Sequence, residues 1–248
     1  MTFFAGWPPP MRLDRVARLA RKEWAEQANG TLWFLTQGLL LFLLGWAQTS
    51  SLFLNGQADL FEYFDVLPFL FAVFMPAFTM RLFAEEYRLG TFDLLAAQPV
   101  SDAELVAGKF VAALGGLGAT LLGGHALIVP LRYLGRPDVR ALEVAFLGAA
   151  LVGAFFLALG LWASTMTRSQ AVALLAGFLL CFTFLGLGPA GRYLAGPVGG
   201  GLAFLGVDGH FDSFRRGVID ARDVLYFLSG TAAGLLGAYA GVAGRRWR

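Results

Sequence analysis

The feature that most constrains this chain is a series of long windows that contain no Asp, Glu, Lys or Arg. Five of these windows are 21 to 32 residues long, and a sixth has 15 residues. A helix needs about 20 apolar residues to cross the hydrocarbon core of a bilayer. The windows are 27–58, 66–80, 110–131, 144–167, 169–191 and 224–244. This pattern predicts an all-α, multi-pass membrane protein.

The composition excludes the other broad classes of protein. Of the 248 residues, 57% are hydrophobic and only 15% are charged, against roughly a quarter in soluble domains. Disordered chains are poor in the aliphatic and aromatic residues that are abundant here. The single cysteine, Cys181, excludes a disulfide scaffold, and a net charge of +2 speaks against nucleic acid as a partner. One membrane domain is therefore expected over residues 1–248.

The number of spans depends on the 15-residue window, which would be only about 22 Å long as a helix. Residues 61–65 lengthen it if Glu62 and Asp65 lie among the lipid headgroups. A five-span and a six-span arrangement both place 12 of the 19 basic residues inside, so the positive-inside rule does not choose between them. Six spans are preferred, because residues 66–80 contain four Phe and no charge, and because both basic ends then lie on one side. The expected spans are 31–49, 62–81, 105–131, 143–166, 169–188 and 222–243, with an external re-entrant loop over 189–221.

Residues 11–28 have the pattern of an amphipathic helix that lies in the membrane interface. Apolar side chains recur at helical spacing on one face, and basic side chains occupy another. The apolar set is Leu13, Val16, Ala17, Ala20 and Trp24, and the basic set is Arg15, Arg18 and Lys22. The alternative is an ordinary solvated basic segment. The position of Trp24 favours the interfacial helix, because Trp prefers the headgroup zone.

The loop after the second span contains several helix boundaries in succession. Residues 81–89 continue the span as a charged helix, and Gly90 fits a left-handed C-cap. Thr91 is a suitable N-cap for a short helix over 92–97, which Pro99 would end. A capping box formed by Ser101 and Glu104 then begins the third span.

The short helix carries Phe92, Leu94 and Leu95. Exposed apolar side chains at the tip of a loop indicate a socket in another protein. We therefore predict that this helix is a docking element.

These residues resemble the ABC-2-type transporter permeases. The resemblance rests on Glu85-Glu86-Tyr87-Arg88-Leu89-Gly90-Thr91, Asp93-Leu94-Leu95, Pro99-Val100-Ser101, Glu104-Leu105-Val106 and Gly108-Lys109. A second block resembles the gliding-motility-type branch of the family. It consists of His210-Phe211-Asp212-Ser213-Phe214, Gly217-Val218-Ile219-Asp220 and Asp223-Val224-Leu225-Tyr226-Phe227.

The resemblance implies an exporter subunit in the cytoplasmic (inner) membrane, with both termini in the cytoplasm. It implies a second permease subunit (the same or a related chain), a cytoplasmic ATP-binding subunit and, in some systems, a large periplasmic or membrane-anchored auxiliary subunit. The implied ATPase-coupling residues are Glu85, Glu86, Arg88, Gly90, Thr91, Phe92, Leu94, Leu95, Pro99, Ser101 and Glu104. The implied external gate comprises His210, Asp212, Ser213, Gly217, Asp220 and Asp223. The sequence has no G-x-x-x-x-G-K-[ST] motif, so ATP and Mg are expected in the partner chain, and no cofactor in this one.

Other readings of the sequence remain open. A mechanical or anchoring component driven by the same kind of ATPase would use the same segment without moving a substrate. An intramembrane enzyme is not expected, because the sequence lacks H-E-x-x-H and G-x-S-x-G. His210 and Asp212 are too few ligands for a metal site. Two polar residues keep alternative readings: His125 forms a helix–helix hydrogen bond or faces a wet path, and Glu143 snorkels or pairs with Arg132 or Arg140.

Overall fold

The computed structural model describes residues 12–55, 60–96, 99–134 and 138–246. Within these ranges six helices are long and apolar enough to cross a membrane, which confirms the predicted all-helical fold with six spans. Met11 and Ala97, which belong to the predicted interfacial and short helices, lie outside the described residues. The helices are α1 (Leu13–Ala28), α2 (Thr31–Asn55), α3 (Phe61–Thr79), α4 (Ala84–Leu89), α5 (Phe92–Ala96), α6 (Asp102–Ala126), α7 (Ile128–Leu134), α8 (Val139–Met166), α9 (Gln170–Tyr193), α10 (Pro197–Leu205), α11 (Val207–Arg215) and α12 (Ala221–Arg246).

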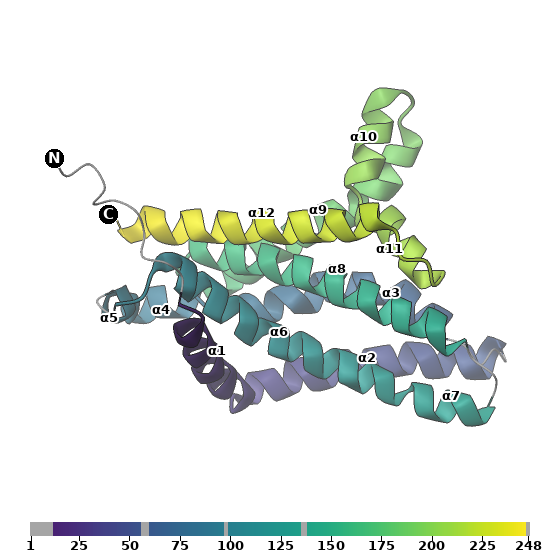
Figure 1. Ribbon diagram of the computed structural model, residues 1–248, viewed down its shortest axis with the longest axis horizontal. Helices are drawn as coiled ribbons and strands as arrows, with labels where there is room; N and C mark the ends of the chain where they lie inside the picture. The colour runs from purple at the N-terminus through teal and green to yellow at the C-terminus, as the bar shows by residue number, and fades with distance from the viewer. Residues whose placement is uncertain (1–11, 56–59, 97–98, 135–137, 247–248) are drawn as a thin grey trace.

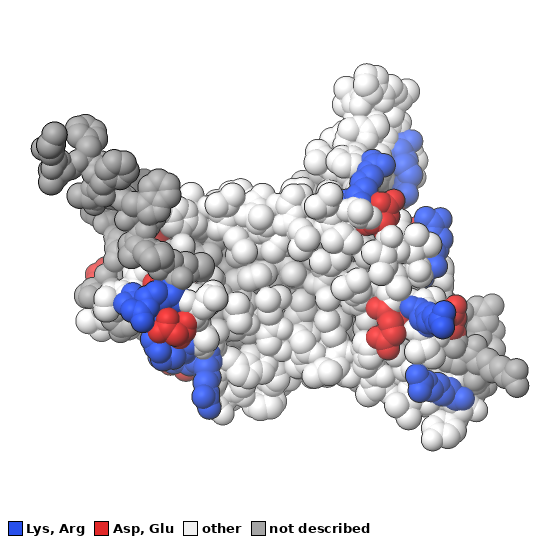
Figure 2. All heavy atoms as spheres, viewed as in Figure 1, with Lys and Arg blue, Asp and Glu red and all other residues white. Residues whose placement is uncertain are grey.

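The long helices run side by side along the longest axis of the molecule (Figure 1). We call one extremity the α1 end, because it carries α1, α4, α5 and the last turns of α12, and the other the α11 end, because it carries α7 and α11. Figure 2 shows charged side chains gathered at these two ends and a broad uncharged surface between them. An uncharged belt between two polar ends suits a bundle that crosses a bilayer, because apolar side chains can face lipid while charges stay in water.

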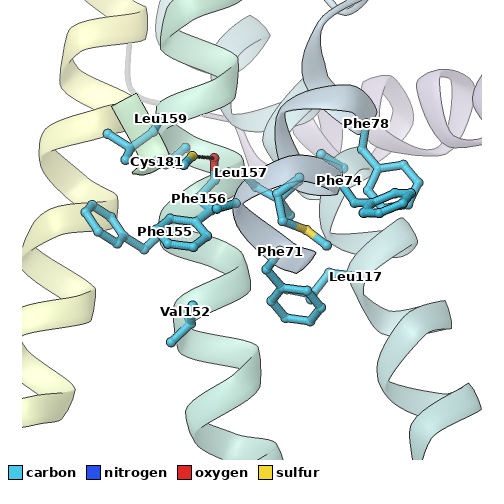
Figure 3. Close-up of a cluster of buried hydrophobic side chains, with 14 of the residues drawn as sticks. Phe71, Phe74, Phe78, Leu117, Val152, Phe155, Phe156, Leu157, Leu159 and Cys181 are labelled. Atoms are coloured by element: carbon cyan, nitrogen blue, oxygen red, sulfur yellow. Dashed lines mark hydrogen bonds between the residues drawn. The ribbon is translucent and has the colours of Figure 1, made fainter. Parts of the chain in front are cut away.

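The centre of the bundle is formed by α8 and α3. The most apolar stretch of α8 is 72% buried within the chain, whereas that of α12 is only 17% buried. Figure 3 shows Phe71 of α3, Leu117 of α6 and Phe156 of α8 packed together in this centre. The thiol of Cys181 lies 3.8 Å from the Phe156 carbonyl oxygen, so this cysteine is a buried packing residue of α9.

Two predicted helices are interrupted. The second span does not continue as one helix through Glu85 and Arg88, because α3 ends at Thr79 and a turn at residues 80–83 precedes α4. The Leu82 N–H bonds to the Thr79 carbonyl three residues back, at 3.1 Å, which is a tighter turn than an α-helix. The third span breaks at Leu127, between α6 and α7. Pro130, which has no N–H for the Ala126 carbonyl, explains this break.

The segment predicted as an external loop is largely helical. Helix α9 continues through Pro189 to Tyr193, five residues beyond the predicted end of the fifth span. Helices α10 and α11 then fill most of the remaining connection. In Figure 1, α10 and the end of α9 project sideways from the bundle near the α11 end. Helical hydrogen bonds therefore satisfy most of the backbone polar groups of this segment.

Candidate functional site

The residues predicted to couple the chain to an ATPase lie together at the α1 end. Helix α4 ends at Leu89 and is capped by Gly90, which has the left-handed φ of 71° and donates its N–H to the Glu86 carbonyl. Glycine suits this position because it has no Cβ to clash. The Thr91 carbonyl accepts the Leu95 N–H at 3.3 Å, so α5 begins immediately after the turn. The sequence therefore builds a tight helix–turn–helix with α5 at its tip.

The exposed apolar group of α5 is Leu94. The prediction that Phe92 is exposed is wrong, because its side chain is only 7% exposed. Its ring packs edge-on against the Tyr87 ring, with 4.9 Å between centroids. Leu94, which is 71% exposed, points elsewhere because residues two apart lie on different faces of a helix. Phe92 is thus an anchor that fixes α5 to α4, and Leu94 is available to a partner.

The polar members of the coupling set fall into separate groups. The Glu85 carboxylate lies 3.4 Å from Arg88 and 3.7 Å from Arg81, on an exposed surface. Such exposed pairs contribute at most about 1 kcal/mol. Ser101 and Glu104 form the predicted capping box at the start of α6. The Glu104 carboxylate also accepts the backbone N–H of Arg12 at 2.8 Å, so this cap joins α6 to the beginning of α1.

A buried ion triad connects α1, α4 and α6. The Nζ atom of Lys109 lies 2.9 Å from Oε1 of Glu23 and 2.6 Å from Oε1 of Glu86. The Lys109 side chain is only 1% exposed, and a buried charge requires partners of opposite sign. Glu23 was not among the site residues predicted from the sequence. Its signal was the spacing of Val16, Ala20 and Glu23, which puts a carboxylate on the apolar face of α1.

Small residues of α6 allow α1 to lie directly on it. A Cβ at Gly108 would be 2.8 Å from the Cβ of Leu19, and a Cβ at Gly115 would lie 2.9 Å from Cδ2 of Trp24. Real side chains do not approach this closely, so glycine is needed where the two backbones meet. The predicted interfacial helix is consequently a packed part of the α1 end.

The last turns of α12 also contact α4. The guanidinium of Arg245 lies 4.1 Å from the centroid of the Tyr87 ring. Its Nε donates to the Thr165 carbonyl near the end of α8 at 3.0 Å. A cation over an aromatic face is attracted by the ring quadrupole. Arg245 therefore links α4 to two of the spanning helices, a role that the sequence analysis did not assign.

The predicted gate residues lie at the α11 end, away from the coupling set. His210 and Asp223 are both buried, and Nδ1 of the histidine lies 2.7 Å from Oδ1 of the aspartate. The other ring nitrogen lies 2.8 Å from the Phe204 carbonyl, and the imidazole stacks on Tyr226 at 4.0 Å. This arrangement ties the end of α10, helix α11 and the start of α12 to one another.

The remaining gate residues end helices or form exposed pairs. Gly217, with φ of 77°, follows the end of α11, and the Asp220 carboxylate accepts the Arg222 N–H at 2.9 Å at the start of α12. Asp212 pairs with Arg215 at 3.0 Å. Ser213 lies inside α11, because that helix begins at Val207.

Two further questions from the sequence are answered in the described part of the chain. No group of three or more His, Cys, Asp or Glu side chains that could hold a metal ion occurs there. His125 and Glu143 pair with each other, with 3.0 Å between Nε2 and Oε2. The partner of Glu143 is thus the histidine of the preceding long helix rather than Arg132 or Arg140.

The family of this chain follows from comparison with known protein families. Residues 19–197 match the model of the ABC-2 family transporter protein. The chain belongs to the ABC-2 transporter family. No curated protein matches it. Membrane subunits of this family usually lack ATPase motifs, and the family generally implies a separate ATP-binding partner. The match extends from α1 to the start of α10, so it includes the whole coupling set. It does not include the block at 210–227 on which the resemblance to the gliding-motility-type branch rests.

Proposed function

We propose that this ABC-2 protein is the permease subunit of an ATP-driven exporter and that a separate ATP-binding subunit docks on α5. The observation that carries the proposal is the position of α5. It lies at the tip of the α1 end and exposes Leu94, while Phe92 and the Tyr87 ring fix it to the bundle. An exposed apolar side chain on a firmly packed helix can insert into an apolar pocket of a partner protein and transmit the movement of that partner.

The α1 end faces the cytoplasm in this proposal. Basic side chains of α1 and the end of α12 gather there, including Arg15, Arg18 and Arg245. An excess of Lys and Arg in short segments next to spans favours the cytoplasmic side. ATP and Mg would be bound by the partner, on that side of the membrane. The α11 end, with His210 and Asp223, would then form the external gate.

Force would pass from α5 through side-chain contacts instead of one continuous helix, because residues 80–83 interrupt the path from α4 to α3. Two side-chain contacts join α4 to other helices. The Glu86–Lys109 pair leads to α6 and α1, and Arg245 on Tyr87 leads to α12. Packed elements with two discrete arrangements are the physical basis of such transmission. The coupling set would therefore move α6 and α12 together with α1.

A second permease subunit is also part of the proposal, as the same chain or a related one. The apolar stretches of α2 and α9 are each only 22% buried within the chain, and that of α12 is 17% buried. These helices leave wide apolar faces for lipid and for a second copy. The assignment to the gliding-motility-type branch and a large auxiliary subunit rest on the sequence resemblance alone.

The docking assignment is tested with the tagged protein purified from the membranes of its own organism. We expect an ATP-binding subunit to copurify with it, and Leu94→Asp to abolish copurification, because a carboxylate cannot enter an apolar socket without loss of hydration. Val218→Asp, an exposed apolar position at the α11 end, is the matched control and should retain the partner. Equal recovery of the partner with both variants would contradict docking on α5.

Reconstitution of the purified complex in liposomes tests export. ATP-dependent, directional movement of labelled cargo supports an exporter. ATP hydrolysis that responds to the chain while no cargo moves would instead assign it to the mechanical or anchoring class.

A further inference from the structure

The end of α9 and helix α10 form an arm, residues 189–205, that the coupling and gate assignments leave without a role. Figure 1 shows this arm projecting across the long axis of the bundle near the α11 end. Pro189 has no N–H for the Leu185 carbonyl, and a proline inside a helix is a common cause of a bend. The 15 residues from Tyr193 to Val207 include no Asp, Glu, Lys or Arg. An uncharged segment outside the bundle needs an environment that accepts apolar side chains.

The arm is a packed hairpin of two helices. A Cβ at Gly191 of α9 would collide with the backbone of Ala203 in α10. A Cβ at Gly199 would collide with the Leu194 carbonyl. Because glycine has no Cβ, the two backbones can touch at both places. Gly196, with φ of 87°, makes the turn between the helices, so the arm has a defined shape.

Polar contacts fasten the base of the arm to the neighbouring helices. The Tyr226 hydroxyl of α12 donates to the Leu205 carbonyl at the end of α10, at 2.6 Å. The guanidinium of Arg192 lies 2.9 Å from the carboxylate of Asp208 in α11. The arm is therefore held to the first turns of α11 and α12 while its tip stays free of them.

Apolar side chains of the arm are exposed on more than one side. Tyr193 at the end of α9 is 91% exposed, and Val198 and Phe204 of α10 are 67% and 42% exposed. Val198 and Phe204 are six residues apart, so they lie on different faces of a helix with 3.6 residues per turn. A folded protein partner would cover one side of the hairpin. A lipid phase, in contrast, can surround it, and the exposure of several faces favours lipid.

The arm lies at the depth of the membrane interface. The membrane normal follows the bundle axis, because the uncharged belt lies between two polar ends (Figure 2). An arm that runs across this axis stays near one depth. Figure 2 shows that it leaves the bundle where the belt meets the charged α11 end, with charged side chains at its base and none at its tip. Tyr is enriched at this depth, and a basic side chain such as Arg192 is attracted to lipid phosphates.

We propose that the arm lies in the interface of the leaflet at the α11 end, with Tyr193, Val198 and Phe204 among the headgroups and the adjoining acyl chains. Its ligand is the bilayer surface itself. Lipid then holds the arm, and the arm holds the beginning of α12 through the Tyr226–Leu205 contact. The proposal does not depend on ATP coupling, since it needs only a bundle that crosses the membrane.

A nitroxide label on single added cysteines tests the position of the arm, with the purified full-length chain in phosphatidylcholine liposomes. The arm positions are Val198→Cys and Tyr193→Cys. The reference for the membrane is Leu122→Cys, an exposed position of α6 in the uncharged window 110–131, and the reference for water is Arg216→Cys, an exposed position at the α11 end. The unchanged protein gives the background, because its one cysteine, Cys181, is buried.

The measurement compares collisions of each label with oxygen, which concentrates in the apolar phase, and with a water-soluble nickel chelate. We expect the logarithm of the ratio of the two collision rates to be positive at 122, 193 and 198 and negative at 216. A negative value at both arm positions would place the arm in water and overturn the proposal. Labels at 193 and 198 that are shielded from both collision partners would also overturn it, because they would assign the arm to a contact with a second subunit.

Discussion

Replacing Lys109 by methionine is the sharpest test of how the α1 end is held together. The change keeps an unbranched side chain of similar length but removes the charge shared by Glu23 and Glu86, at 2.9 and 2.6 Å. Two carboxylates then remain in a site where the Glu23 side chain is 9% and the Glu86 side chain 16% exposed. Removing one partner of a buried ion pair costs about 3–5 kcal/mol. For a domain of this size that corresponds to a loss of roughly 6–20 °C in the melting temperature.

Thermal unfolding of the detergent-purified protein measures the melting temperature, and hydrogen–deuterium exchange locates the loss. We expect the amides of α1 to exchange faster in Lys109→Met, because the triad joins α1 to α6. Lys22→Met is the matched control. Lys22 pairs with Glu26 at 3.5 Å on an exposed surface, where an ion pair contributes at most about 1 kcal/mol. Its melting temperature should stay within about 2–4 °C of the unchanged protein.

A compensated variant separates charge from packing. Glu23→Gln and Glu86→Gln, added to Lys109→Met, remove all three charges, and we expect most of the lost stability to return, since a neutral site has no unpaired ion to bury. An unchanged melting temperature and unchanged α1 exchange in Lys109→Met would refute the reasoning. Equal destabilisation of the single and the compensated variants would show that packing, and not the ion triad, holds α1.

Two further changes test the left-handed turn at Gly90 and the buried contact between His210 and Asp223, which we call the latch of the α11 end. Gly90→Ala should lower the free energy of unfolding by roughly 1–2 kcal/mol, because a φ of 71° strains a residue with a Cβ. The control Gly45→Ala lies in a helix with no atom within 4 Å of the new Cβ and should be neutral or stabilising. Similar losses of stability in both variants would contradict the strain argument. Asp223→Asn should speed amide exchange in α10 and α11 by weakening the buried bond to His210, at a cost of about 1–3 kcal/mol. Asp208→Asn, in an exposed pair, should change exchange little, and a slow-exchanging α10 in Asp223→Asn would count against the latch.

Features that depend on local chemistry alone were predicted correctly from the sequence. The capping box of Ser101 and Glu104 depends on a spacing of three residues, and the left-handed turn at Gly90 depends on a missing Cβ. Both were predicted correctly, since neither needs a distant partner. The errors fall where a distant partner decides the outcome. Phe92 was predicted to be exposed, but its ring packs against the Tyr87 ring on the other side of the turn.

The partners of the buried charges show the same limit. Lys109 appeared in the sequence as part of a family motif, but Glu23 lies 86 residues away from it along the chain. His125 and Glu143 were singled out separately, and their pairing across two helices was not foreseen. A one-dimensional pattern gives the face on which a side chain lies, while the neighbour opposite that face depends on how the helices are packed.

The sequence by itself determined that this chain is embedded in a membrane. Segments of about 20 apolar, uncharged residues are stable as helices in the hydrocarbon core of a bilayer, because their side chains are apolar and their backbone polar groups are paired within the helix. Charged side chains are not stable there. Two polar ends follow from that, and the four Phe of the short window at 66–80 favour six spans over five. Folding in three dimensions then decided which helices form the centre, and it brought Glu23, Glu86 and Lys109 into one buried cluster. It also opened a cavity beside Trp33, since the packing of side chains from several helices depends on shapes that no local pattern contains.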